Sequence, residues 1–318
     1  MKSSTLNDVL ACLPAGRTHF RYYKGAYASR LLALLIDNKA SIGAVKQSNF
    51  KSLLTNSLVK QHMAETGQGF LCATKLEELW QEPSLPFLLG LDRWGQQSHW
   101  RWNQTSRPGE NIVLQLILPL VHKRLYDQNI DQRGVTTING RYSAHPVQKP
   151  GRSKSYRDTL AWARIDFDLD TSEALIEEVQ SDAVRNVYRW QRRVGDCPCS
   201  YCSSIRRYIN WFKKYDEVWA EAMLMAAIWF IKYELGLDTV YYHSDRSGWQ
   251  LKNMDKNWRA PKSLYSRLPR KFCFTQTWTA PEFLLGTRAY QQVIRRNPDI
   301  DFYRLKLGQL TSEVNHAT

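Results

Sequence analysis

The sequence predicts an α+β protein whose C-terminal half has the alternating order of an α/β domain. Three observations support this prediction. Helical patterns dominate residues 4–80, and strand-like runs follow over residues 85–118. In the second half, two strand candidates precede a long apolar helix, and further strand candidates follow it. This order excludes an all-helical fold.

The N-terminal segment is expected to form a small helical unit. Residues 27–36 carry closely spaced leucines, a pattern typical of a buried helix. Ser48 is a suitable N-cap for a second helix over residues 49–65, and a short strand is expected at 70–73. Helix, turn, helix and strand is the order of a winged-helix DNA reader and also of many plain helical subdomains, and both alternatives stay open.

Strand candidates follow at residues 87–91, 100–103 and 111–118, separated by glycine and proline turns. The next segment is rich in Gly, Pro, Ser and basic residues, which is typical of a linker. We therefore predict three parts: a helical and then β-rich N-terminal part over residues 1–126, a basic linker over 127–157, and a C-terminal domain over 158–318.

The C-terminal domain is expected to begin with a hairpin of strands at 160–168 and 174–179. A helix over 217–235, apolar on nearly every side, is predicted to be buried and to end at Gly236. A strand at 240–243, a short helix at 264–268 and a strand at 272–278 complete the mixed sheet.

Composition indicates the kind of partner. The 318 residues carry a net charge of +14, and the sequence pI is about 9.5. Strongly basic chains attract phosphate backbones or other polyanions. No stretch reaches the roughly 18 apolar residues that span a bilayer, and the N-terminus lacks a signal peptide pattern. We therefore expect a cytoplasmic protein with reduced cysteines, a nucleic-acid or other polyanionic partner, and no membrane contact.

One row of polar side chains stands out in the second strand of the hairpin. Side chains alternate along a strand, so Glu178, Gln180 and Asp182 are expected on one face and Glu177 on the other. Such a row suits ligand binding or general acid–base catalysis. The alternative is a solvated face at the end of a strand.

Two further features carry candidate binding residues. Cys197, Cys199 and Cys202 form a zinc site with three thiolate ligands or, alternatively, a reduced and locally packed loop. Basic and aromatic residues alternate on both sides of the apolar helix, a pattern that favours nucleic-acid binding. The candidate contacts are Arg189, Arg192, Arg193, Arg206, Arg207, Trp211, Lys213, Lys214, Arg246, Lys252 and Arg259.

From residue 220 onward the chain resembles the later half of GCN5-related N-acetyltransferase (GNAT) folds. The resemblance is carried by the buried helix ending at Gly236, the strand at 240–243 and the segment 263–274. In that family the tyrosine of the following helix often serves as general acid, which implies this role for Tyr265. The family's acyl-CoA pyrophosphate loop should lie within 182–217, but that segment has only one glycine, Gly195, so the cofactor stays unknown.

The segment Glu-Val-Gln-Ser-Asp at 178–182 is similar to E-x-Q-S-D segments of large polyvalent proteins of phages and plasmids, which implies a mobile-element context. Our leading hypothesis is a nucleic-acid-binding protein whose C-terminal domain transfers a group, with Glu178, Gln180 and Asp182 in the site and His243 and Tyr265 as proton carriers. The alternatives are a non-catalytic binding factor on the same fold and a metal-dependent nucleic-acid enzyme. The sequence leaves open DNA against RNA, the donor and the oligomeric state.

Overall fold

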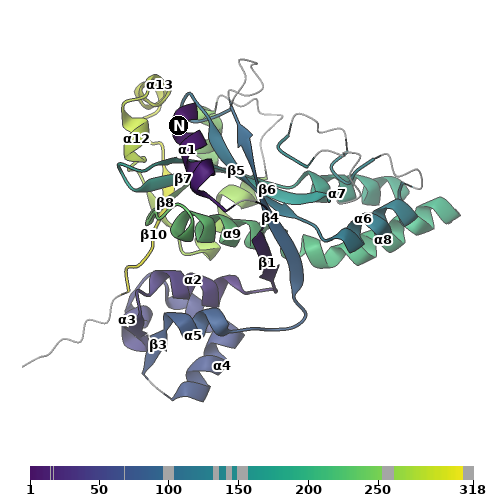
Figure 1. Ribbon diagram of the computed structural model, residues 1–318, viewed down its shortest axis with the longest axis horizontal. Helices are drawn as coiled ribbons and strands as arrows, with labels where there is room; N and C mark the ends of the chain where they lie inside the picture. The colour runs from purple at the N-terminus through teal and green to yellow at the C-terminus, as the bar shows by residue number, and fades with distance from the viewer. Residues whose placement is uncertain are drawn as a thin grey trace, which may run out of the picture.

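The computed structural model describes residues 1–14, 16, 18–67, 69–95, 104–131, 136–140, 145–148, 157–252 and 261–310. It confirms an α+β protein, with one eight-stranded mixed sheet at its centre (Figure 1). The strand order is β1-β4-β5-β6-β7-β8-β10-β9. These strands are β1 (Thr18–Tyr22), β4 (Leu85–Trp94), β5 (Asn111–Ile117), β6 (Thr159–Asp168), β7 (Glu173–Gln180), β8 (Thr239–His243), β9 (Thr275–Thr277) and β10 (Phe302–Lys306).

Neighbouring strands of the described sheet are antiparallel except at one position. Strands β4 to β7 are antiparallel neighbours, and β10 pairs antiparallel with both β8 and β9. Among the named strands of the described residues, only β7 and β8 are parallel, and their pairing runs from Glu173–Thr239 to Ile176–Tyr242. A parallel pair needs a crossover connection, and three helices supply it here. These are α7 (Asp182–Val194), α8 (Ser200–Asp216) and α9 (Trp219–Tyr233).

Helix α9 packs across one face of the sheet, where it contacts β5, β6 and β7. Its residues from Ala222 to Ile228 are all buried, as the sequence predicts for a helix that is apolar all round. Gly236 follows the helix with a φ of 68°, a left-handed conformation that favours glycine.

Below the sheet in Figure 1 lies the N-terminal helical unit. It contains α2 (Tyr27–Leu35), α3 (Ile42–Gln47), the 3₁₀ helix η1 (Lys51–Thr55), α4 (Ser57–Thr66), α5 (Ala73–Glu78) and the two-stranded sheet of β2 (Lys39–Ser41) and β3 (Phe70–Cys72). The prediction of one helix over 49–65 is wrong. The Asn56 side chain accepts hydrogen bonds from the backbone N–H groups of Leu58 and Val59, so a new helix begins after it.

Three helices extend to one side of the sheet and form what we call the helical arm (Figure 1). The arm consists of α6 (Leu120–Asn129), α7 and α8, and α8 contacts both of the others. Aromatic rings fill the space between them. The Tyr208 ring lies 5.9 Å from the His122 ring and 5.8 Å from the Tyr126 ring, and its hydroxyl lies 2.7 Å from His122 Nε2.

The sheet includes strands from both sides of the predicted linker 127–157. Strand β5 precedes that segment and pairs with β6, which follows it. Residues 1–126 and 158–318 therefore share one sheet, with no break in the hydrogen-bonded ladder at the predicted boundary. The predicted strand at 100–103 lies outside the described residues.

The remaining helices lie near the ends of the chain and around β8. They are α1 (Ser3–Cys12), α10 (Asp245–Leu251), the 3₁₀ helix η4 (Lys262–Tyr265), α11 (Arg267–Lys271), α12 (Glu282–Leu285) and α13 (Arg288–Arg296). Among the helices in the described ranges, none has the length and apolar character needed to cross a membrane.

Candidate functional site: a buried polar cluster and an exposed basic arm

Strand β7 has one extra residue, Glu177, relative to its partner strand β6. Glu178 pairs with Arg164, but the next pair is Ile176 with Ile165, so Glu177 has no partner across the ladder. Such a β-bulge interrupts the simple alternation of side chains. The prediction that Glu177 and Glu178 point to opposite faces is therefore wrong.

Glu177 contacts the loop of residues 104–107 directly, and Glu178 is linked to the same loop through Arg164. Glu177 accepts two hydrogen bonds from Ser106, one from the backbone N–H at 2.9 Å and one from Oγ at 2.8 Å. Arg164, the partner of Glu178, donates to the carbonyl oxygen of Gln104 at 2.7 Å. The bulge thus gathers two acidic side chains of neighbouring positions at one place.

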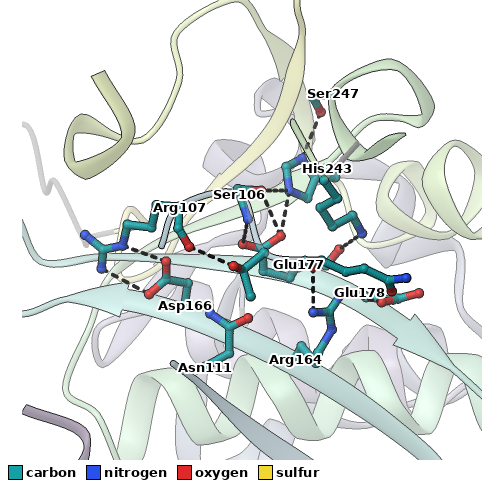
Figure 2. Close-up of polar contacts among 12 residues, drawn as sticks. Ser106, Arg107, Asn111, Arg164, Asp166, Glu177, Glu178, His243 and Ser247 are labelled. Carbon is teal, nitrogen blue, oxygen red and sulfur yellow. Dashed lines mark hydrogen bonds and ion pairs between the residues drawn. The ribbon is translucent and has the colours of Figure 1, made fainter. Parts of the chain in front are cut away.

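His243, the last residue of β8, completes this arrangement (Figure 2). Its Nε2 lies 3.1 Å from a Glu177 carboxylate oxygen and 2.8 Å from Ser106 Oγ, while its Nδ1 lies 3.0 Å from Ser247 Oγ. Ser247 Oγ already accepts from the backbone N–H of Ser244, so its own proton is free to go to Nδ1. We therefore assign the proton of a neutral His243 to Nε2.

This geometry differs from that of a nucleophilic serine triad. In a triad the serine and the acid bind opposite nitrogens of the histidine ring. Here Ser106 and Glu177 both contact Nε2, and the side chains of all three residues are fully buried. The trio is a packed hydrogen-bond network, and it excludes Ser106 as an accessible nucleophile in this conformation.

Burial and charge set the ionisation of the network in opposite ways. Burial alone raises the pKa of Glu177, but the hydrogen bond with His243 and the positive charges of Lys252 and Arg164 outweigh it, and the pKa falls to about 2. Burial, together with the positive charges of Lys252 and Arg164, lowers the pKa of His243 below its ordinary value although Glu177 acts in the opposite direction. At neutral pH the network therefore holds an ionised carboxylate beside a neutral imidazole.

Lys252 closes the gap that opens where β7 and β8 stop pairing. The parallel ladder ends at Ile176–Tyr242, and the next carbonyl oxygen of β7, that of Glu177, accepts from Lys252 Nζ at 2.8 Å. The same ammonium group lies 3.4 Å from the hydroxyl of Tyr265. Burial lowers the pKa of Lys252 and raises that of Tyr265 well above its usual value.

Glu178 forms a buried ion pair with Arg164, and the two groups are 2.5 Å apart. Burial raises the pKa of Glu178, but the charges of Lys252 and Arg164 bring it below its ordinary value. The Arg164 guanidinium also lies 4.8 Å from the centre of the Trp94 ring. Three buried polar atoms nearby, Glu178 Oε1, Arg164 Nε and Tyr242 Oη, have no hydrogen-bond partner among the residues described.

The predicted row of Glu178, Gln180 and Asp182 does not share one site, because Glu178 and Asp182 contact different side chains. Strand β7 ends at Gln180, and Asp182 is the first residue of α7. Asp182 is fully buried and accepts from His145 at 2.8 Å and from Trp162 Nε1 at 3.3 Å. Glu178, His243 and Tyr265 meet around Lys252 instead. We define the buried polar cluster as Ser106, Arg164, Glu177, Glu178, His243, Lys252 and Tyr265.

The structure changes the prediction for Lys252. Its side chain is buried in the polar cluster, so it contacts the backbone of β7 and not solvent. Arg246 lies on the exposed side of α10 and donates to the carbonyl oxygen of Asp299. Arg259 is outside the described residues.

Most of the other predicted contacts lie on the helical arm. Arg189, Arg192, Arg193, Arg207, Lys213 and Lys214 are exposed, and Arg206 is half-buried. Trp211 is also half-buried, because its ring packs against His122 and Tyr215 inside the arm. In the described part of the chain, Arg192, Arg193, Arg207 and Lys213 form no ion pair with a carboxylate.

The three cysteines lie at the tip of the arm, where α7 connects to α8. Cys197 and Cys199 are exposed and Cys202 is half-buried, and none forms a disulfide. The thiol of Cys199 accepts from the backbone N–H of Cys202, which caps α8. This bond and the contact with Cys197 lower the pKa of Cys199 to about 7.

A cavity of about 540 Å³ lies away from these features, between β1, α2 and α9, and is lined in part by Phe20, Arg30, Met225 and Trp229. It contacts no member of the polar cluster. A comparison with family models, curated proteins and solved structures finds no match for this chain. The resemblances to GNAT folds and to mobile-element proteins therefore stay predictions, and function is argued from the sites themselves.

Proposed function

We propose that this protein binds nucleic acid through phosphate contacts on the helical arm. The observation that carries the proposal is that four exposed cations on α7 and α8, Arg192, Arg193, Arg207 and Lys213, have no carboxylate partner among the described residues. Positive side chains held on a rigid helical surface attract phosphates and release their counterions. Cations that already pair with carboxylates would contribute far less.

The charge balance along the arm is uneven. Residues 182–216 contain eight arginine and lysine residues and three aspartates, a difference of five positive charges. Two of the aspartates have protein partners, since Asp182 contacts His145 and Asp216 accepts from the hydroxyl of Tyr188. Asp196 alone of the three is exposed without such a bond. The field around the arm is therefore strongly positive.

Aromatic side chains on the same surface support contact with bases. Tyr201, at the start of α8, is 62% exposed, and Tyr188 on α7 is 48% exposed. Base stacking on exposed aromatic rings accompanies phosphate contacts in proteins that bind single strands. Trp211, which the sequence predicts as a stacking residue, is half-buried in the arm, so we assign it to packing.

The salt dependence of binding tests this proposal. Arg192 and Arg193 lie in the last turn of α7, and Arg295 and Arg296 lie in the last turn of α13, on another part of the molecule. Replacing either pair by alanine lowers the net charge by the same two units. If both arm residues contact phosphates of duplex DNA, the first change should reduce the slope of log K against log salt by about 1.8.

The matched pair on α13 should leave affinity and slope almost unchanged. Filter binding or fluorescence anisotropy with duplex DNA, single-stranded DNA and RNA at several salt concentrations gives both quantities and identifies the preferred ligand. Equal losses in the two double variants would mean that only the overall charge matters, and the arm would not be the binding surface.

A second candidate function, group transfer on a GNAT-like domain, is favoured by one observation. The parallel strands β7 and β8 are joined through the buried helix α9, and three unpartnered polar atoms lie where their pairing ends. A polar ligand bound beyond the end of the β7–β8 pairing would supply hydrogen-bond partners for these three atoms. Native mass spectrometry of the purified protein, with and without added CoA and acetyl-CoA, tests this: an unliganded spectrum throughout removes the acyl-CoA version.

We do not propose a two-metal or magnesium-dependent reaction. The carboxylates that would hold the ion already face cations: Glu178 pairs with Arg164, Asp182 with Arg185, and Asp166 with Arg107 at 2.7 Å. A magnesium ion would have to displace the buried guanidinium of Arg164 from Glu178 and the half-buried one of Arg107 from Asp166.

A further inference from the structure

The loop at the tip of the helical arm brings three sulfur atoms together. The Sγ atoms of Cys197 and Cys199 are 3.3 Å apart, and all three sulfurs, including that of Cys202, lie within 4.8 Å of one another. A tetrahedral zinc ion with Zn–S bonds of about 2.3 Å holds its thiolates about 3.8 Å apart. The three sulfurs therefore match such a site with only small side-chain rotations.

Hydrophobic packing does not explain this arrangement. Cys197 and Cys199 are exposed, so their thiols gain little from burial. The backbone produces the cluster: Gly195 has a φ of 41°, in the left-handed region, and the N–H of Cys197 then donates to the carbonyl oxygen of Val194 at 3.0 Å. The turn directs Cys197 back toward the start of α8.

The surroundings favour negative charge. Three thiolates around one divalent ion leave a net charge of −1. Cys199 caps α8, a helix of 17 residues, so the sulfurs lie at the positive end of its dipole. Arg206 crosses the loop, with its guanidinium 3.3 Å from the carbonyl oxygen of Gly195, and the last turn of α7 carries Arg192 and Arg193.

We propose that Cys197, Cys199 and Cys202 bind one zinc ion, with a water molecule in the fourth position. No fourth histidine, cysteine or carboxylate among the described residues joins the group. Thiolates select soft or borderline ions such as zinc over magnesium and calcium. The ion ties the end of α7 to the start of α8 and so fixes the spacing of the cations near the tip.

The test measures metal on the protein alone and so does not depend on nucleic-acid binding. The full chain is purified under reducing conditions without chelator, incubated with zinc and desalted. Elemental analysis should give about one zinc per chain, because thiolate sites bind this ion tightly. Titration with Co²⁺ should also produce the near-ultraviolet charge-transfer bands of cobalt–thiolate bonds.

Two variants make the result specific. Cys199→Ser should reduce the zinc content from about one equivalent to less than about a tenth, since two thiolates and an open coordination sphere bind weakly. Cys12→Ser removes an exposed, free cysteine elsewhere and should retain the full equivalent. Zinc content that is zero in the reduced wild type, or unchanged in Cys199→Ser, overturns the proposal. A protein that takes no zinc but forms a Cys199–Cys202 disulfide would have a redox pair instead.

Discussion

Replacing Glu178 by glutamine provides a direct test of whether the buried polar cluster holds the fold together. The change keeps the shape of the side chain and removes its charge. Both members of the Glu178–Arg164 pair are almost completely buried, with 2% and 0% of their side-chain surface exposed. Breaking such a pair leaves a buried guanidinium uncompensated, which costs about 3–5 kcal/mol. The glutamine oxygen still accepts a hydrogen bond, so we expect the lower end of that range.

Urea unfolding at pH 7.5 measures this cost. A matched control is Glu78→Gln, which breaks the exposed Lys75–Glu78 pair and should change the free energy of unfolding by less than about 1 kcal/mol. Arg164→Met also removes the hydrogen bond to Gln104, so its cost exceeds that of the ion pair. A double-mutant cycle with Glu178→Gln and Arg164→Met isolates the energy of the pair, and we expect a coupling energy of about 1–3 kcal/mol.

The reasoning is refuted if Glu178→Gln is as stable as the wild type and the coupling energy is zero. That result would place Glu178 in contact with solvent or in its neutral form. A loss of nucleic-acid affinity in this variant, with stability unchanged, would instead favour the sequence-based prediction of a functional row. Binding by the arm should otherwise be unaffected in the folded fraction.

Two further outcomes follow from the same cluster. The native pKa values of His243 and Glu177 lie below their ordinary values of 6.5 and 4.5, so the unfolded chain takes up protons first. The free energy of unfolding should therefore fall as the pH drops below about 6.5, because of His243, and fall further below about 4.5, because of Glu177; a rise over this range in urea unfolding would contradict the assignment. Tyr242→Phe removes a buried hydroxyl that has no partner in the described part of the chain and should leave stability unchanged or slightly higher, whereas Tyr265→Phe should lower it by about 1 kcal/mol. A clear loss in Tyr242→Phe would reveal a bound water or ligand at that hydroxyl.

The elements that the sequence predicts well are those with strong local signals. The buried helix α9, its glycine stop and the hairpin of β6 and β7 are present close to their predicted positions. Strands β1 and β10 were not predicted; each takes its stability from pairing with its neighbours in the sheet, which its own residues do not indicate. The break at Asn56 was not predicted, because it depends on one capping side chain within a sequence pattern that is helical on both sides.

The candidate site shows the same division between local and long-range information. Sequence reasoning identified Glu178, His243 and Tyr265, but not Ser106 or Arg164. Ser106 comes from a loop 71 residues before Glu177, and Arg164 faces Glu178 only through the register of the β6–β7 hairpin. It also placed Glu177 on the wrong face, because a β-bulge depends on the register between two strands and leaves no mark in one of them. Composition alone could not separate the buried Lys252 from the exposed arginines.

The charge balance of the two sites decides which of them can bind an anionic partner. In the buried polar cluster, Arg164 and Lys252 offset Glu177 and Glu178, and the neutral His243 adds nothing, so the net charge is zero. A phosphate entering there would have to replace a carboxylate that the fold needs. Residues 182–216 of the helical arm carry an excess of five positive charges, and most of their cations are exposed. An anionic partner therefore gains most on the arm, while the cluster fits a neutral polar ligand or none.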